Sequence, residues 1–352
     1  MPGLAYPPFP EDIPTFPLLV IDYELVKRGN QEEIDRLWGA ATQLGFWYLK
    51  NHGVTDEVNA MFDMGAETLS LPLDEKLKYE QGDDGNSFGY KVAGGSAVDE
   101  DGNLDCVEYL NISRNDALAW PGKIHRGYPE TVNERMESVI KPFVQKSMEI
   151  NLTCLNAFND KLGLPKGTLA SKHGIDELSC CEARCIKKAG GVADDKKALG
   201  SHTDFGSLSF LHNRTGGLQV LPPDMDEWQY IKPIPSYAVC NIGDTLSIFS
   251  GGVLRSSLHR VITPPKEQAA YDRWSVVFFT RPADDIELRA FTELSPTIAE
   301  AVASSPDPSK FSTGHTAKSW FYRRKRGRRV KNRTGPETWR ESRGMEHKPY
   351  VY

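Results

Sequence analysis

Two histidines and one aspartate have the side-chain types and the spacing of a metal site. His202 and Asp204 are separated by one residue in the segment 199–206 (LGSHTDFG), and residues two apart in an extended chain project to the same face. His259 lies in a later segment, 257–261 (SLHRV), which we expect to return as another strand. Two imidazoles and one carboxylate form the facial triad that leaves neighbouring positions open on Fe(II). We therefore predict that these three residues bind iron.

Zinc is the alternative metal for such a trio. A His-x-Asp pair alone is a weak signal, because both residues are common at strand ends. A zinc hydrolase could use two histidines and a carboxylate, but its usual helical His-Glu-x-x-His motif is absent from the sequence. The sequence therefore favours iron over zinc.

An arginine and a serine form a second group with a chemical signature. Arg273 and Ser275 share one face at the start of the segment 273–280, which continues as the apolar run 276–279 (VVFF). The alternative is a surface arginine at a strand start, but an unpaired charge within so apolar a strand would be costly. A guanidinium fork beside a hydroxyl suits a carboxylate. We therefore expect a buried anionic partner for Arg273.

The segments around these residues have the pattern of short β-strands. After residue 179 the sequence alternates apolar runs with turn residues, and many short strands with Gly and Pro turns imply a sandwich or barrel. The expected strands are 207–212, 217–221, 228–234, 237–242, 245–250, 259–263 and 273–280.

The N-terminal half has a mixed pattern of strands and helices. We expect a strand at 16–23, helices at 31–44 and 55–71, a strand at 46–49, and a long amphipathic helix over 129–162. The segment 81–102 is rich in Gly, Asp and Ser and is typical of a long loop at the border of an active site.

Composition places the chain among ordinary globular proteins. Of its 352 residues, 39% are hydrophobic and 26% are charged, and its apolar stretches are far shorter than the roughly 20 residues of a membrane-spanning helix. The N-terminus lacks the features of a secretory signal, and the six cysteines lack the regular spacing of a disulfide framework. We expect a soluble cytoplasmic protein with reduced thiols and no membrane partner. The sequence gives no indication of oligomeric state.

A basic run lies near the C-terminus. Residues 323–331 (RRKRGRRVK) hold seven positive charges in a chain whose net charge is −6. Such a run can mark a nuclear signal or a nucleic-acid patch. The acidic remainder of the chain instead favours the solvated basic face of a terminal helix, so we expect no nucleic-acid partner.

These motifs together resemble the isopenicillin N synthase-like branch of the 2-oxoglutarate and iron dependent dioxygenases. The matching segments are 202–204 (HTD), 216–220 (GGLQV), 241–244 (NIGD), 257–261 (SLHRV) and 273–275 (RWS), preceded by 17–22 (PLLVID), 45–53 (GFWYLKNHG) and 88–90 (FGY). They occur in the family's order and at its spacing, and the resemblance extends from Phe16 to Pro282.

The resemblance implies a mainly β fold with flanking helices, whose core is a double-stranded β-helix, or jelly roll. It also implies four segments in one compact unit. These are an N-terminal region of strands, helices and a long loop (1–128), a long helix and connection (129–178), the jelly-roll core that binds Fe(II) and 2-oxoglutarate (179–285), and a helical, basic C-terminal segment (286–352).

The function that the resemblance implies is a dioxygenase that uses Fe(II), 2-oxoglutarate and O2 to oxidise a small organic molecule. Hydroxylation and desaturation-type chemistry both fit, and secondary metabolism is the expected setting. Arg273 and Ser275 would bind the far carboxylate of 2-oxoglutarate. One departure is 182–188 (EARCIKK), which lacks a tyrosine that helps to hold 2-oxoglutarate in many relatives. Lys187 or Lys188 could take that contact.

Two alternatives stay open within this resemblance. An oxidase of the same fold that needs no 2-oxoglutarate also has the Arg-x-Ser pattern, and the missing tyrosine supports it. A nuclear oxygenase that modifies nucleic acid is suggested by the basic run, but the acidic remainder argues against it.

The expected substrate wall consists of Phe205, Arg184 and Phe279, with Phe88 and Tyr90 of the Gly-rich loop at the entrance. Phe205 directly follows the ligand Asp204, and even spacing from Arg273 places Phe279 on the same inward face. The resemblance places Arg184 toward the substrate, while a structural salt bridge is the alternative. Aromatic walls with one directional polar group are suited to orienting a substrate.

Overall fold

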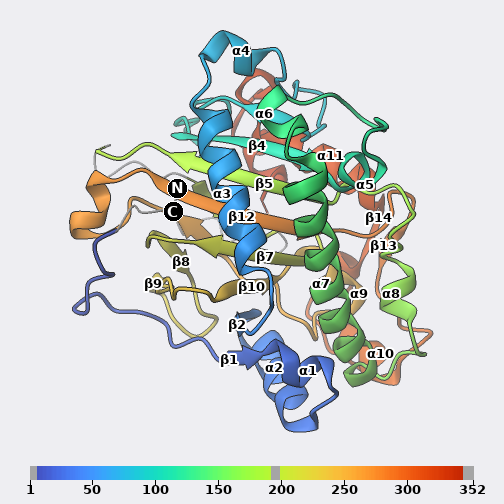
Figure 1. Cartoon of the computed structure of the whole chain (residues 1–352). Coiled ribbons are helices and arrows are strands. Elements are labelled where there is room, and N and C mark those ends of the chain that lie inside the picture. The colour runs from blue at the N-terminus through green and yellow to red at the C-terminus, as the bar shows by residue number, and fades with distance from the viewer. Residues whose placement is uncertain (1–5, 192–198, 344–352) are drawn as a thin grey trace.

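Antiparallel strand pairing dominates the computed structural model, which describes residues 6–191 and 199–343 (Figure 1). The large sheet contains, in spatial order, β1 (Val20–Asp22), β2 (Phe46–Lys50), β10 (Ala238–Ile242), β7 (Leu208–Asn213), β12 (Arg273–Thr280), β5 (Glu182–Lys188), β4 (Val107–Ser113) and β3 (Gly89–Lys91). The small sheet contains β6 (Leu199–His202), β11 (His259–Val261), β8 (Leu218–Val220) and β9 (Gln229–Tyr230). A separate hairpin-like pair joins β13 (Glu287–Arg289) to β14 (Ser312–Thr316).

The two larger sheets form the layers of a jelly roll. Side chains from β5, β7 and β12 of the large sheet and from β6, β8 and β11 of the small sheet line one cavity. Successive side chains along each of these strands point alternately into the cavity and away from it, as the pleat requires. The predicted fold, a double-stranded β-helix with flanking helices, is confirmed.

Helices cover the outside of the large sheet and close its ends. The longer ones are α2 (Gln31–Gln43), α3 (Thr55–Leu69), α7 (Lys141–Lys161), α10 (Pro296–Ala303) and α11 (Ala317–Arg328). The shorter ones are α1 (Tyr23–Lys27), α4 (Leu73–Leu77), α5 (Arg114–Ala119), α6 (Glu130–Asn133), α8 (Thr168–Ser171), α9 (Asp244–Phe249) and α12 (Pro336–Glu341), with helical turns η1 (Met136–Ile140), η2 (Lys266–Ala270), η3 (Pro308–Phe311) and η4 (Val330–Asn332). Within the described part of the chain, no helix combines the length and the apolar character needed to cross a membrane.

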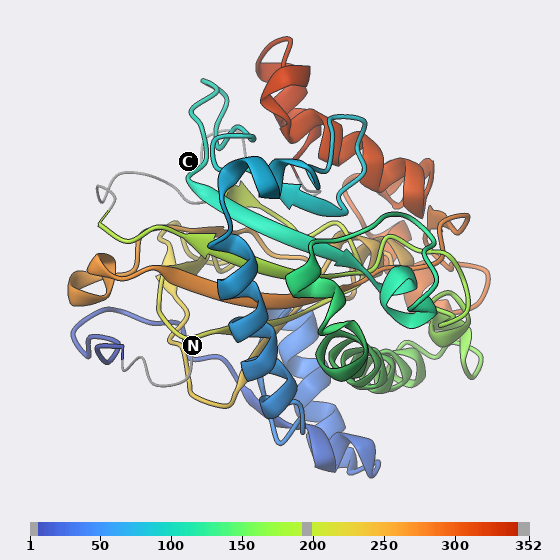
Figure 2. The ribbon, with the colours of Figure 1, turned by 45° about the horizontal axis from the view of Figure 1, so that its top comes forward.

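α3 and α7 lie across the outer face of the large sheet and contact β12 (Figures 1 and 2). Figure 2 shows the C-terminal helices in red at the top of the molecule, far from α1 and α2 at its bottom. The main hydrophobic core extends from Ile21 to Trp320 in sequence, so both halves of the chain share it. A small separate cluster packs Phe321 of α11 with Phe205 and Cys180.

Several sequence predictions about single elements are corrected by the structure. Residues 245–250, expected as a strand, belong to helix α9 and its C-terminal cap. Every residue of α9 is buried, so its sequence lacks the apolar periodicity that distinguishes a helix from a strand. The long helix expected over 129–162 is broken into α6, η1 and α7, with Pro142 in the first turn of α7. The strand expected at 228–234 pairs only at Gln229–Tyr230, before two prolines.

Candidate functional site

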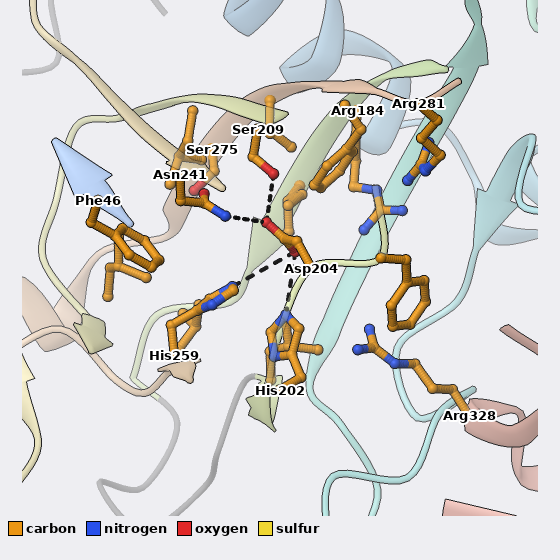
Figure 3. A pocket seen from close by; sticks show the side chains of 18 of the residues that line it. Phe46, Arg184, His202, Asp204, Ser209, Asn241, His259, Ser275, Arg281 and Arg328 are labelled. Atoms are coloured by element: carbon orange, nitrogen blue, oxygen red, sulfur yellow. Dashed lines mark hydrogen bonds and ion pairs between the residues drawn. The ribbon is translucent and has the colours of Figure 1, made fainter. Parts of the chain in front are cut away.

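The three predicted metal ligands converge at one end of the small sheet. His202 ends β6, His259 begins β11, and the two residues are direct partners in the antiparallel pairing of these strands. Asp204 follows two residues after His202, where the chain leaves the strand. One ligand atom from each residue lies within 4.8 Å of the other two, and Figure 3 shows the three side chains directed at one point. The Nε2 atoms of His202 and His259 lie 3.8 and 3.7 Å from Oδ1 of Asp204.

Hydrogen bonds on the far side of each ligand hold it in this orientation. Nδ1 of His202 donates to the carbonyl of Gly200 at 2.8 Å, and Nδ1 of His259 to that of Ser257 at 3.2 Å, which leaves both Nε2 atoms free for a metal. Asp204 accepts hydrogen bonds through Oδ2 and presents Oδ1 to the histidines.

Two polar side chains from the large sheet fix the Asp204 carboxylate. The Ser209 hydroxyl of β7 donates to Oδ2 at 2.5 Å, and the Asn241 amide of β10 donates to the same oxygen at 2.8 Å (Figure 3). Burial acts to raise the pKa of Asp204, but His259 and these two hydrogen bonds outweigh it and leave the pKa lowered. Burial and the neighbouring His259 hold the pKa of His202 well below its usual value. At neutral pH His202 is therefore a neutral imidazole and Asp204 a carboxylate. With His259 as the second imidazole, the trio is the donor set that Fe(II) accepts.

Arg273 and Ser275 lie next to each other in the wall of the same cavity. Nη1 of Arg273 donates to the Ser275 hydroxyl at 2.8 Å, and Nε donates to the carbonyl of Gly216 at 2.7 Å. Arg273 is only 4% exposed, and burial lowers its pKa to about 10. The described residues place no carboxylate in an ion pair with it. A buried guanidinium of this kind favours an anionic ligand.

Neither lysine that could replace the missing tyrosine lines the cavity. Lys187 forms an ion pair with Asp272 at 3.4 Å and lies over the ring of Trp274. Lys188 is buried and is the strand partner of Arg273, but Arg184 and Ile186 are the residues of the segment 182–188 that line the cavity.

Three of the five expected substrate contacts line the cavity. Phe205, Arg184 and Phe279 are all part of its wall. Arg184 also forms a salt bridge with Glu182 at 2.6 Å and lies 4.8 Å from the ring centre of Phe279. Arg184 therefore lines the cavity, as expected of a substrate contact, and also forms the alternative structural salt bridge with a buried acid.

Phe88 and Tyr90 are not part of this wall, and the expectation that they contact substrate is corrected. Tyr90 belongs to strand β3 and is 2% exposed, and its hydroxyl donates to Glu108 at 2.8 Å. Phe88 packs on His125, with ring centres 4.8 Å apart. A loop composition rich in Gly and Asp conceals this short buried strand, because one edge strand of three residues leaves little periodicity to detect.

One wall of the cavity was not predicted from the sequence. Phe321, Lys325 and Arg328 of α11 line it, together with Arg281, which directly follows β12. The expectation of a solvated basic face is therefore wrong for the run 323–331. Arg324, Lys325 and Arg329 are buried, while Arg323, Arg326 and Lys331 are exposed. The signal was present in the spacing, because 321, 325 and 328 share one helical face.

Comparisons with known proteins agree on one family. A model of the 2OG-Fe(II) oxygenase superfamily matches residues 180–282, and a model described as non-haem dioxygenase in morphine synthesis N-terminal matches residues 18–147. A 2-oxoglutarate-dependent dioxygenase of Glarea lozoyensis is 30% identical over 261 residues, which are 73% of this chain and 76% of the relative. A 2-oxoglutarate-dependent dioxygenase of a Dothideomycetidae species is 28% identical over 279 residues, covering 78% of this chain and 84% of the relative.

Solved structures show the same fold at lower sequence identity. A full-length Neurospora crassa protein in complex with alpha-KG superposes with a TM-score of 0.71 at 22% identity, covering 91% of this chain and 99% of that one. The rice dioxygenase for auxin oxidation superposes with a TM-score of 0.61 at 23% identity, covering 87% of this chain and 99% of that one.

Proposed function

Because this chain belongs to the 2OG-Fe(II) oxygenase superfamily, we propose that His202, Asp204 and His259 are the ligands of its Fe(II). The observation that carries this assignment is the geometry of the trio: two buried histidines and the partly buried Asp204 face one point, and each is held from behind by hydrogen bonds. The chain is accordingly a 2-oxoglutarate-dependent dioxygenase, with Fe(II) as its cofactor and 2-oxoglutarate and O2 as the cosubstrates that its site must hold.

The cosubstrate site follows from the same cavity. We assign Arg273 and Ser275 to the far carboxylate of 2-oxoglutarate, because they form a buried cationic group on the large-sheet wall and Arg273 has no acid partner among the described residues. Apolar side chains of Leu211, Leu218 and Val261 line the same cavity and help to shield a bound carboxylate from water. A guanidinium fork with an adjoining hydroxyl matches that group in charge and in hydrogen-bond geometry.

When bound, Fe(II) and 2-oxoglutarate activate O2 and so supply the oxidant that removes hydrogen from a substrate carbon. The protein must then orient one C–H bond and keep water away. Phe205 and Phe279 provide flat apolar walls for this, and Phe46 packs edge-on to the ring of His259, with ring centres 5.4 Å apart. The reaction that we propose is hydroxylation or desaturation of a small organic molecule.

Secondary metabolism is the setting that the comparisons favour for this chain. The N-terminal family model is described by its role in morphine synthesis, and the relatives reported above come from fungi. Nucleic acid is a poorer candidate for the substrate. Three of the seven charges in the basic run are buried, and a fourth, Arg328, lines the cavity rather than an open face.

The experiment that tests the proposal is an anaerobic titration of the Fe(II) protein with 2-oxoglutarate. We expect the weak visible charge-transfer band of chelated 2-oxoglutarate to appear in the native protein. It should be absent in His202→Ala and Asp204→Ala, and it should require more 2-oxoglutarate in Arg273→Ala. A native protein that consumes O2 and substrate without the band, and without forming succinate, would establish the alternative oxidase of the same fold.

A further inference from the structure

The outer half of the cavity has more positive than negative charge. Its wall contains Arg184, Arg281, Lys325 and Arg328, and Asp204 is the only carboxylate in the described lining. Glu182 lies behind this wall and is shared by Arg184 and Arg281, at 2.6 and 3.2 Å. One acid therefore serves two arginines.

Loading the metal and the cosubstrate does not remove this excess. Fe(II) with Asp204 leaves one positive charge, Arg273 adds another, and the two carboxylates of 2-oxoglutarate cancel both. The inner half of the cavity is then neutral. The outer four cations and Glu182 still leave three uncompensated positive charges among the described residues. Burial acts to raise the pKa of Tyr109, but Lys325, Arg184 and Lys91 outweigh it and lower the pKa to about 7. An ionised Tyr109 would offset only one of the three positive charges.

Arg328 is the least satisfied of these cations. Its Nε and Nη2 atoms are buried and have no hydrogen-bond partner, and no carboxylate of the described residues forms an ion pair with it. Its guanidinium lies 4.5 Å from the ring centre of Phe205, the residue after the ligand Asp204. Figure 3 shows the side chain reaching from α11 into the cavity, toward His202. A buried guanidinium without an acid is costly, so a ligand that supplies the acid is favoured.

The neighbouring cations are committed to protein groups, in contrast to Arg328. Lys325 donates to the Tyr109 hydroxyl at 2.9 Å, and Arg184 donates to Asn111 at 2.7 Å as well as to Glu182. Arg281 lies over the rings of Phe321 and Phe279, at 4.4 and 5.0 Å from their centres. These groups form a positively charged wall in which apolar ring faces lie between the charges.

We propose that the substrate carries a carboxylate, and that Arg328 of α11 binds this group while the apolar part of the substrate lies against Phe205 and Phe279. The inference rests on the proposed function, since it names the substrate class of that same site. A carboxylate matches the guanidinium fork, and its negative charge offsets part of the two or three positive charges that remain after cosubstrate binding. Arg328 is a substrate-binding residue in this assignment, and α11 is the element that sets specificity.

The test uses the full-length protein loaded with Mn(II) and saturating 2-oxoglutarate, so that no turnover occurs. Calorimetry measures the binding of three matched series: benzoate, phenylacetate and 3-phenylpropanoate, their primary amides, and phosphate monoesters with the same aromatic group. At least one carboxylate should bind roughly 10- to 100-fold more tightly than its amide, the range expected for hydrogen bonds to a charged group. Arg328→Gln should remove that preference, and Arg328→Lys should keep part of it.

The matched control is Arg326→Gln, which removes an exposed cation from the same helix and should leave the preference unchanged. Arg328→Gln should also melt no lower than the native protein when no carboxylate is present, because its guanidinium has no ion pair to lose and its burial is costly. A lower melting temperature would instead assign Arg328 a structural role and overturn the inference.

The remaining outcomes are also decisive. Equal binding of carboxylates and amides, or no carboxylate binding in the series, overturns the inference. Tighter binding of the phosphate monoesters than of the carboxylates would overturn it in favour of a substrate that carries a phosphate group. Weaker 2-oxoglutarate binding in Arg328→Gln would move this residue to the cosubstrate site. Failure of the proposed function itself is distinct, because the Fe(II) protein would then show no charge-transfer band with 2-oxoglutarate.

Discussion

His202 and His259 face each other across the β6–β11 pair, with ring centres 4.2 Å apart and both Nε2 atoms turned toward Oδ1 of Asp204. This arrangement brings together residues that are far apart in sequence, and it requires the register of the two strands. A slip of one residue would turn either ring to the opposite face of the sheet.

The first prediction concerns the metal. His202→Ala and Asp204→Ala should each abolish turnover and reduce the bound iron, because two remaining ligands hold a labile divalent ion poorly. The measurement is iron content after dialysis, with activity assayed in parallel. His315→Gln is the control, since this partly exposed histidine lies outside the trio. Native iron content in either ligand variant would remove the assignment.

A second prediction concerns the two groups that hold Asp204. Ser209→Ala and Asn241→Ala should each weaken Fe(II) binding roughly 10- to 100-fold, since groups that orient a metal ligand typically contribute that much. Both variants keep the three ligands, so full activity should return at high Fe(II) concentration. Competition with a calibrated chelator measures the affinity, and an unchanged value would mean that Asp204 needs no support.

The third prediction separates the dioxygenase from the oxidase alternative. Arg273→Ala should raise the KM for 2-oxoglutarate roughly 10- to 100-fold or more, because hydrogen bonds to a charged group contribute about 1.5–3 kcal/mol. The KM of Arg273→Lys should lie between those of the native protein and Arg273→Ala, since lysine keeps the charge but lacks the guanidinium fork. An unchanged KM with normal coupling of succinate to product would show that Arg273 does not bind 2-oxoglutarate. Turnover that neither requires 2-oxoglutarate nor forms succinate would support the oxidase.

Product control is the subject of the fourth prediction. Phe205→Ala and Phe279→Ala should alter the product distribution or uncouple succinate formation from substrate oxidation, while iron and 2-oxoglutarate binding persist. Phe88→Leu is the matched control, because the structure places Phe88 against His125 and outside the cavity wall. Unchanged regiochemistry and coupling in both cavity variants would show that the substrate does not bind against Phe205 and Phe279.

The last prediction concerns stability and pH. His173 is buried, its two ring nitrogens lie 2.6 Å from the Leu169 carbonyl and from the Ser207 hydroxyl, and burial lowers its pKa to about 4. Its contribution to stability is present above the unfolded pKa near 6.5 and is lost as the pH falls toward 4. The loss is on the order of 3 kcal/mol at most. His202 and His212, whose pKa values burial also lowers, act in the same direction.

Urea unfolding between pH 7.5 and pH 5 measures this slope. His173→Asn should flatten it, because the variant has no group that titrates at this position, whereas His315→Asn should have little effect. Equal slopes for the native protein and His173→Asn would show that other groups govern acid unfolding.

The residue pairs of the proposed metal and cosubstrate sites could be predicted from sequence because short-range geometry determines which side chains share a face. In an extended strand, residues two apart must share a face, so His202 with Asp204 and Arg273 with Ser275 were identifiable without any tertiary contact. The same rule placed Phe279 correctly on the inward side of β12. The shared face of each pair needed only the local strand, which was recognisable from its turns and apolar run. The iron and 2-oxoglutarate roles came from the family resemblance, because a His-x-Asp pair alone is a weak signal.

The substrate side of the cavity was decided by tertiary structure alone. The spacing of Phe321, Lys325 and Arg328 defines one face of a helix, but helical periodicity does not tell whether that face meets water or a cavity. A run of seven positive charges favours water on average, because burying an unpaired charge is costly. Only the packing of α11 against Phe205 turns Lys325 and Arg328 toward the site. The desolvation cost that made such burial improbable from sequence is the reason the cavity now favours an anion.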